Sequence, residues 1–160
     1  MDQLIDISLT VNGEAVSTRV SARTNLVDFL WVELDLTGSH VGCEHGVCGA
    51  CTISVDGVIV RGCLMLAVQA DGADVVTIEG LHDSGEISDL QDAFLQRNAL
   101  QCGFCTPGML LASAEYLKTN GAPDREGIRE FLSGNYCRCT GYEAIVDAVE
   151  KVARTRGGSK

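Results

Sequence analysis

This 160-residue sequence lacks a surplus of basic residues and has no long apolar run. Lysine and arginine number 12 against 22 aspartate and glutamate residues, which gives a formal net charge of -10. Nucleic acids and anionic membrane surfaces bind proteins through clustered basic residues, so we expect neither as a partner. No apolar stretch approaches the roughly 18 residues of a membrane-spanning helix, so we expect no membrane insertion. The rest of the composition, 46% hydrophobic and 21% charged, is typical of an ordinary folded protein.

Motifs for nucleotide binding and for nucleophilic catalysis are also absent. No G-x-G-x-x-G follows a predicted strand, and no G-x-x-x-x-G-K-[ST] occurs, so we expect no nucleotide or flavin in this chain. The three histidines form no Ser/His/Asp or Cys/His pattern with the other polar residues. We therefore predict no catalytic residue here, and a chain that is not an enzyme on its own.

The first residues show no targeting signal. Residues 1–6 contain no basic segment, no twin arginine and no continuous apolar core, so we expect neither a secretory nor a twin-arginine signal. This favours a cytoplasmic protein in a reducing compartment, where eight cysteines indicate metal binding rather than disulfides. Disulfides are the alternative if the sequence is the mature form of a secreted protein.

Three cysteines lie within nine residues, and a fourth follows after eleven more. The spacing C-x4-C-x2-C with a later cysteine is the plant-type pattern for a 2Fe-2S cluster, in which four thiolates hold two irons. We expect the glycines of this loop to take positive φ values and to point backbone N-H groups at the cluster sulfurs. The cysteines are Cys43, Cys48, Cys51 and Cys63, and the glycines are Gly42, Gly46 and Gly49.

The first half of the chain has the pattern of a small α+β unit. Alternating apolar residues predict hairpins over residues 4–20 and 52–60, with turns at Asn12-Gly13 and Asp56-Gly57. Helical spacing predicts a helix from Thr24 or Asn25 to Leu34, which Thr37-Gly38 would stop. Residues 74–79 have the pattern of a last strand. We expect these elements to form a domain over residues 1–80.

The second half has helical patterns only. Residues 80–85 are polar and contain glycine, so we predict an exposed linker there and a second domain over residues 86–160. Four short amphipathic helices with brief connections predict a four-helix bundle. The residues expected to cap these helices are Ser88, Thr106, Asp124 and Thr140.

A second set of cysteines lies in this half. It forms two pairs, each directly before a threonine that we expect to cap a helix, so the helix dipole would stabilise thiolates and an anionic cluster. If the two helix pairs pack around a pseudo-twofold axis, the four sulfurs converge on one point. Zinc is the chemical alternative to iron, although C-x-C some thirty residues after C-x2-C is unusual for a zinc ribbon. The set consists of Cys102, Cys105, Cys137 and Cys139.

The two sets together resemble a known family. Three motifs and Cys63 are similar to those of the iron-sulfur subunit of the molybdenum hydroxylases. The motifs are G-C-E-H-G-V-C-G-A-C-T, Q-C-G-F-C-T-P-G-M and G-N-Y-C-R-C-T-G-Y. The match runs from about residue 4 to about residue 152. The resemblance implies a β-grasp plant-type ferredoxin domain that binds one 2Fe-2S cluster through the first set. It also implies a helical domain that binds a second 2Fe-2S cluster through the second set.

The same resemblance implies a place in a complex. A large partner subunit would hold molybdopterin, in its cytosine dinucleotide form, and another partner would hold FAD, in a heterotrimer or a dimer of heterotrimers. Residues Gln101 and Cys139 match positions that approach the pterin in this family. Electrons would therefore enter through the helical cluster and leave through the β-grasp cluster. The substrate is not implied: aldehydes, purines, other N-heterocycles and carbon monoxide all remain open.

Two other functions and several local features remain open. The chain could instead be a free-standing ferredoxin-like carrier, or a zinc-stabilised interaction module. His45 invites a Rieske-type interpretation, but four cysteines already complete that set. Arg138 lies between two expected ligands and could tune a cluster potential or form a surface ion pair. The departures from the family pattern are His40 for a common lysine, Gly62 for a common serine, and Ser88-Asp89 for a common His-Pro.

Overall fold

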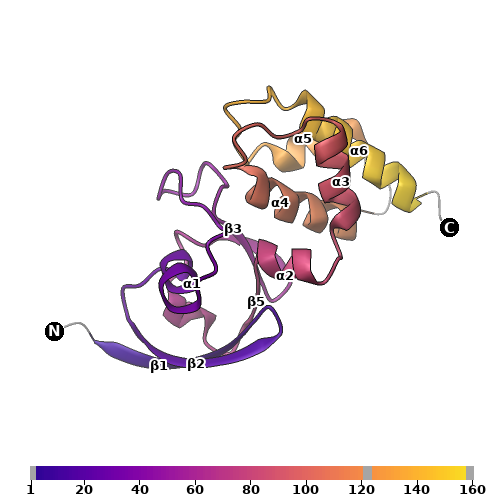
Figure 1. Cartoon of the computed structure of the whole chain (residues 1–160). Coiled ribbons are helices and arrows are strands. Elements are labelled where there is room, and N and C mark those ends of the chain that lie inside the picture. The colour runs from indigo at the N-terminus through magenta and orange to yellow at the C-terminus, as the bar shows by residue number, and fades with distance from the viewer. Residues whose placement is uncertain (1–2, 121–123, 158–160) are drawn as a thin grey trace.

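The computed structural model describes residues 3–120 and 124–157, and it places a five-stranded sheet with one helix before a group of helices (Figure 1). The first half contains β1 (Leu4–Val11), β2 (Glu14–Ser21), α1 (Leu26–Leu34), β3 (Thr52–Val55), β4 (Val58–Arg61), the 3-10 helix η1 (Ala67–Ala70) and β5 (Asp74–Val76). The second half contains α2 (Ile78–Asp83), α3 (Ser88–Gln96), α4 (Thr106–Thr119), α5 (Arg125–Leu132) and α6 (Glu143–Gly157).

The sheet has the strand order β2-β1-β5-β3-β4 and curves around α1 (Figure 1). Strand β1 pairs in parallel with β5, and the other pairs are antiparallel. Both predicted hairpins are confirmed. Asn12 and Gly13 have φ of 51° and 85°, and Asp56 and Gly57 have φ of 50° and 78°, as two-residue type I′ turns require.

Helix α1 fills the concave side of the sheet, where its Phe29 and Leu30 are fully buried. Asn25 is the N-cap, because its side chain accepts a hydrogen bond from the Asp28 N-H at 2.8 Å. The helix ends earlier than the predicted stop at Thr37-Gly38, since Asp35 takes a left-handed φ of 55°.

The predicted last strand and linker are wrong in part. Strand β5 ends at Val76, and residues that we expected in the strand and in an exposed linker form α2 instead. Thr77 precedes α2 and exchanges two hydrogen bonds with the Asn12 side chain, at 2.8 and 3.0 Å. Ile78 and Leu81 pack against the helical core, so tertiary contacts override the local strand pattern here. The division into domains 1–80 and 86–160 stays a prediction.

The four predicted helices are present as α3 to α6, and they enclose a hydrophobic cluster distinct from the one under the sheet. Helix α4 also packs against β3 and β4, which joins the two halves. The largest fully buried side chains of the helical cluster are Phe94, Ile87, Leu90, Met109, Ile128 and Ile145.

Only one of the four predicted helix caps is confirmed. The Asp124 carboxylate accepts a hydrogen bond from the Gly127 N-H at 2.8 Å at the start of α5. Ser88 and Thr106 are instead the first residues of α3 and α4. Thr140 lies before α6, which begins at Glu143, and its hydroxyl has another partner described below.

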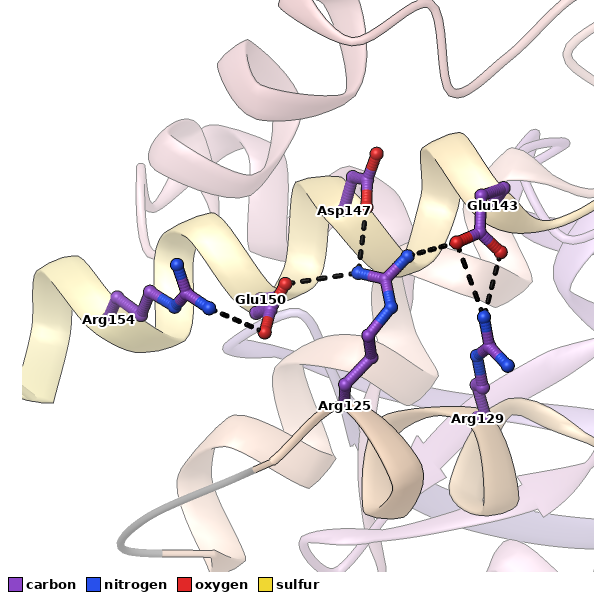
Figure 2. Close-up of polar contacts among 6 residues, drawn as sticks. All are labelled: Arg125, Arg129, Glu143, Asp147, Glu150 and Arg154. Atoms are coloured by element: carbon purple, nitrogen blue, oxygen red, sulfur yellow. Dashed lines mark hydrogen bonds and ion pairs between the residues drawn. The ribbon is translucent and has the colours of Figure 1, made fainter.

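Helices α5 and α6 are joined by an ion network (Figure 2). The Arg125 guanidinium contacts three carboxylates of α6: Glu143, Asp147 at 2.7 Å and Glu150 at 3.0 Å. Arg129, one turn along α5, also pairs with Glu143, at 2.9 Å. These contacts hold α5 against α6.

Within the described ranges, none of the helices combines the length and the apolar composition that crossing a bilayer requires.

Candidate metal centres

The first cysteine set is gathered by two segments, the loop between α1 and β3 and the turn after β4. Cys43 and Cys48 lie on the loop between α1 and β3, Cys51 directly precedes β3, and Cys63 lies in the turn after β4. The sulfurs fall into two contacting pairs, Cys43 with Cys48 and Cys51 with Cys63. The structure therefore brings all four predicted residues to one place, as two pairs.

Backbone N-H groups of the loop surround the Cys43 sulfur. The amide of Cys48, and then those of His45 and Val47, donate to this sulfur and lower the pKa of the Cys43 thiol to about 6. Gly46 and Gly49 have positive φ values of 85° and 72°, as predicted. A positive φ at Gly42 is not found, so that prediction is wrong. A Cβ at Gly42 would instead lie 3.3 Å from the Cys48 sulfur, which makes this a close approach.

The partner sulfurs in this set resist ionisation. Burial raises the pKa of Cys48, and burial followed by the contact with Cys51 raises the pKa of Cys63 to about 11. A second negative charge beside the first is unfavourable, so without metal each pair retains a proton. Metal binding would release these protons, and both sulfurs of each pair would then be bound as thiolates.

The second cysteine set is gathered where α4 begins and where the loop between α5 and α6 returns to it. The Cys139 sulfur lies 3.6 Å from that of Cys102, and the Cys105 sulfur contacts that of Cys137. Cys105 is itself the N-cap residue of α4. The structure again brings four predicted residues together as two pairs.

The less exposed pair of this set, Cys105 and Cys137, has opposite pKa shifts. Burial, then the Cys137 sulfur, raises the pKa of Cys105 to about 12. Burial also disfavours ionisation of Cys137, but the Thr140 hydroxyl and the amides of Cys139 and Thr140 donate to its sulfur and lower its pKa. The Thr140 oxygen lies 3.1 Å from the Cys137 sulfur. Thr140 therefore stabilises a thiolate here and does not cap a helix.

The other pair of this set lies at the surface. Cys102 and Cys139 are exposed, and the exposed Gln101 side chain donates to the Cys139 carbonyl oxygen at 3.0 Å. The two residues expected near a pterin therefore lie side by side. Arg138 is exposed between two of the cysteines. This edge of the chain is open to a partner molecule.

The pairing of sulfurs fits a cluster with two metal ions. Each iron of a 2Fe-2S cluster takes two thiolates, so four cysteines in two contacting pairs suit two irons. A structural zinc site needs four ligands around a single ion. Within the described residues, no group of three or more His, Cys, Asp or Glu side chains surrounds a position for one metal ion, and each cysteine set is instead divided into two pairs.

Two departures from the family pattern, His40 and Gly62, have local explanations. The His40 ring stacks on Phe104 with centroids 4.7 Å apart, and its Nδ1 lies 2.7 Å from the Phe104 carbonyl oxygen, which links the two cysteine loops. A Cβ at Gly62 would lie 2.5 Å from Ile53 and 2.6 Å from Val27, so a side chain in this turn would require these two residues to shift. His45 is exposed and contacts the Cys43 carbonyl through Nδ1.

Three polar residues near both cysteine sets were not predicted. Arg61, Thr52 and Asn135 form hydrogen bonds between the first cysteine loop and the segment before Cys137. Asn135 and Thr52 are buried. Arg61 and Asn135 are 74 positions apart, and no sequence pattern connects them. The one signal in the sequence is that Arg61 is an arginine at the end of a predicted strand.

Comparisons with known proteins agree with this geometry. The family model described as a 2Fe-2S iron-sulfur cluster binding domain matches residues 9–74. The model described as a [2Fe-2S] binding domain matches residues 77–150.

Whole proteins of similar sequence and structure are also known. The chain is 55% identical to caffeine dehydrogenase subunit gamma from Pseudomonas sp. (strain CBB1), over 93% of this chain and 91% of that one. It is 52% identical to the nicotine 6-hydroxylase small subunit from Paenarthrobacter nicotinovorans, over 91% and 87%. A chain of quinoline 2-oxidoreductase from Pseudomonas putida 86 superimposes with a TM-score of 0.90 at 48% identity, over 99% of both chains. The protein therefore belongs to the family of small iron-sulfur subunits of the molybdenum hydroxylases, and it carries two 2Fe-2S binding domains.

Proposed function

We propose that this chain relays electrons from a molybdopterin held by a large partner subunit to FAD held by a second partner. The observation that carries the proposal is the arrangement of eight cysteines as four contacting sulfur pairs. Two such pairs suit one 2Fe-2S cluster, and two clusters in series suit transfer of one electron at a time. The chain's own residues would bind the clusters, surround them with N-H donors and exclude water.

Two sets of ligands follow from this proposal. Amide donors to Cys43, and the hydroxyl and amides around Cys137, stabilise thiolates in each set before any metal is bound. Such donors would raise the reduction potential of a cluster that these sulfurs hold. The proposed ligands are Cys43, Cys48, Cys51 and Cys63 for the first cluster, and Cys102, Cys105, Cys137 and Cys139 for the second.

The exposed edge of the second set is the proposed entry point for electrons. Cys102, Cys139 and Gln101 lie at the surface, where a partner's pterin could approach them. The first set has no exposed cysteine, so we assign it the later position, on the flavin side. The resemblance of the motifs to the family supports the same order.

The relatives also suggest a class of substrate and a form of complex. Caffeine, nicotine and quinoline, named in three relatives, are all nitrogen heterocycles. We propose that the complex hydroxylates a nitrogen heterocycle, with the pterin in its cytosine dinucleotide form. We further propose a heterotrimer or a dimer of heterotrimers in the cytoplasm, where thiolates remain reduced.

Purification of the tagged chain from its native host tests this function. We expect two co-purifying subunits, molybdenum and FAD, together with dye reduction when caffeine, nicotine or quinoline is added. A chain that purifies alone and exchanges electrons as a diffusing monomer would contradict the proposal and favour a ferredoxin-like carrier. A chain with bound zinc and no iron would favour an interaction module.

A further inference from the structure

A backbone hydrogen bond connects the loops of the two cysteine sets. The Tyr136 N-H donates to the Cys48 carbonyl oxygen at 2.8 Å. Cys48 belongs to the first set, and Tyr136 directly precedes Cys137 of the second. A continuous route therefore runs from Cys48 through one hydrogen bond and one peptide link to Cys137.

This route matters because electrons tunnel more readily through bonded atoms and hydrogen bonds than through empty space. The connection depends on the positions of the loop before β3 and the segment after α5. Neither segment is a helix or strand that would fix it by regular backbone hydrogen bonds. Side-chain contacts must therefore hold the two segments together.

Asn135 provides the first of these contacts. Its side chain is buried, and its Nδ2 donates to the Gly49 carbonyl oxygen at 3.0 Å and to Thr52 Oγ1 at 3.3 Å. The Thr52 hydroxyl also donates to the Gly49 carbonyl oxygen, at 2.6 Å. Asn135 is thus bound to the first cysteine loop on one side and immediately precedes Tyr136 on the other.

Arg61, at the end of β4, provides the second contact and joins both segments at once. Its Nη1 donates to Thr52 Oγ1 at 2.6 Å, and its Nη2 donates to the Gly134 carbonyl oxygen at 2.8 Å. Its Nε donates to the Gly46 carbonyl oxygen at 3.3 Å. The rigid fork of a guanidinium can make these bonds together, whereas an ammonium cannot reproduce them.

The two segments approach so closely that side chains are excluded between them. A Cβ at Gly49 would lie 2.5 Å from the Gly134 carbonyl oxygen. A Cβ at Gly108, in the first turn of α4, would collide with the Gly49 carbonyl oxygen. The backbones are therefore in direct contact at this point of the fold.

We propose that Asn135 and Arg61 are positioning residues that hold the Tyr136 N-H on the Cys48 carbonyl and so set the rate of electron transfer between the two clusters. This inference rests on the proposed function. With a cluster bound at each set, the route would carry one electron per event. The second set's cluster would be oxidised, the first set's cluster would be reduced, and no proton would move along the route.

Three variants test the proposal in the purified complex. Asn135→Leu keeps the side-chain volume and removes the two hydrogen bonds that the amide donates. Arg61→Lys keeps the positive charge and removes the guanidinium fork. Thr52→Val removes the hydroxyl that both residues contact, with little change in side-chain shape. Arg19→Lys is the matched control, because Arg19 is an exposed arginine on β2 that pairs with Asp6 at 3.1 Å.

Two quantities are measured. The first is the magnetic coupling between the two clusters in EPR spectra of the dithionite-reduced complex. The second is the rate at which electrons equilibrate between the clusters after rapid partial reduction. We expect all variants to retain iron and both individual spectra. Asn135→Leu and Arg61→Lys should weaken the coupling and slow equilibration several-fold, Thr52→Val should do so to a smaller extent, and Arg19→Lys should change neither.

The outcomes separate this inference from the proposed function. Variants with a lower melting temperature but unchanged coupling and rate would show a structural role only and would overturn the inference. If Asn135→Leu or Arg61→Lys does not fold, unchanged coupling and rate in Thr52→Val would overturn it equally. A wild-type complex without two 2Fe-2S signals would instead refute the proposed function.

Discussion

The sulfur atoms of Cys102 and Cys139 lie 3.6 Å apart, although 37 positions separate the two residues in the sequence. The contact forms because the loop between α5 and α6 lies against the start of α4. The neighbouring contact of Cys105 with Cys137 forms in the same way. This geometry distinguishes the second site from a local C-x2-C motif and makes it depend on the packing of three helices.

Substitution of one second-set cysteine is predicted to affect one cluster only. Cys139→Ser replaces a thiolate by a poorer ligand for iron, so EPR of the reduced protein should show a perturbed or lost signal for the second cluster. It should also slow reduction of the flavin by substrate. Cys43→Ser is the matched control and should perturb the other signal. Equal loss of both signals in either variant would argue against two separate sites.

Substitution of Gly49 is predicted to be more harmful than substitution of Gly57. Both glycines have positive φ, at 72° and 78°, so alanine carries a backbone cost of about 1 kcal/mol at either position. Only at Gly49 would the new Cβ also overlap a backbone carbonyl, because nothing lies within 4 Å of a Cβ at Gly57. Denaturant unfolding should therefore give a clearly larger loss for Gly49→Ala. Similar losses in the two variants would contradict the close approach.

Loss of Arg125 is predicted to destabilise the helical half more than loss of Arg154. Arg125 contacts three carboxylates, and the hydrogen bonds that it donates to Asp147 and then to Glu143 are the main causes of its raised pKa (Figure 2). Arg154 is more exposed, and within the described residues it pairs only with Glu150. Arg125→Gln should lower the melting temperature more than Arg154→Gln, the control with the same change of charge. A larger shift for the control would show that the network adds little.

The Asp89–Arg156 pair is predicted to stabilise the fold equally from about pH 5 to about pH 8. The hydrogen bond from Arg156 is the main cause of a lowered pKa for Asp89. A carboxyl with a lowered pKa contributes stability above its unfolded pKa, and the contribution disappears only as pH falls through the folded value. Because the pair is partly exposed, Asp89→Asn should cost about 0.5 kcal/mol throughout this range. Denaturation at several pH values checks this, and a cost that already disappears at the acidic end would contradict it.

Local patterns predicted much of the fold. Two-residue turns with positive φ, such as Asn12-Gly13, carry a strong local signal, and both hairpins were predicted correctly. The helix start at Asn25 also depends only on neighbouring residues. Such features follow from short-range steric and hydrogen-bonding preferences, which the sequence expresses directly.

Features set by distant residues were missed. Helix α2 was predicted as strand and linker, because its environment is created by Asn12 and by the helical core. Thr140 was predicted as a helix cap, whereas its hydroxyl donates to Cys137. The bonds of Arg61 and Asn135 join segments far apart in the sequence, so no local pattern predicts them.

The structure brings together the cysteines that the spacing had grouped into two sets, but their pairing was not predicted. Their role as metal ligands stays a prediction. Contact of Cys43 with Cys48 and of Cys51 with Cys63 depends on how the loop folds back on the turn after β4. The positive φ expected at Gly42 failed for a similar reason, since that residue is held against the Cys48 sulfur instead.

Quantitative EPR of the fully reduced complex, with iron and sulfide analysis of the same sample, tests the central claim most directly. We predict two distinct 2Fe-2S signals of equal spin intensity, and about four iron atoms and about four acid-labile sulfides per chain, two of each for every 2Fe-2S site. A single signal with half that iron, or zinc in place of iron, would contradict the account of the chain as a two-cluster relay.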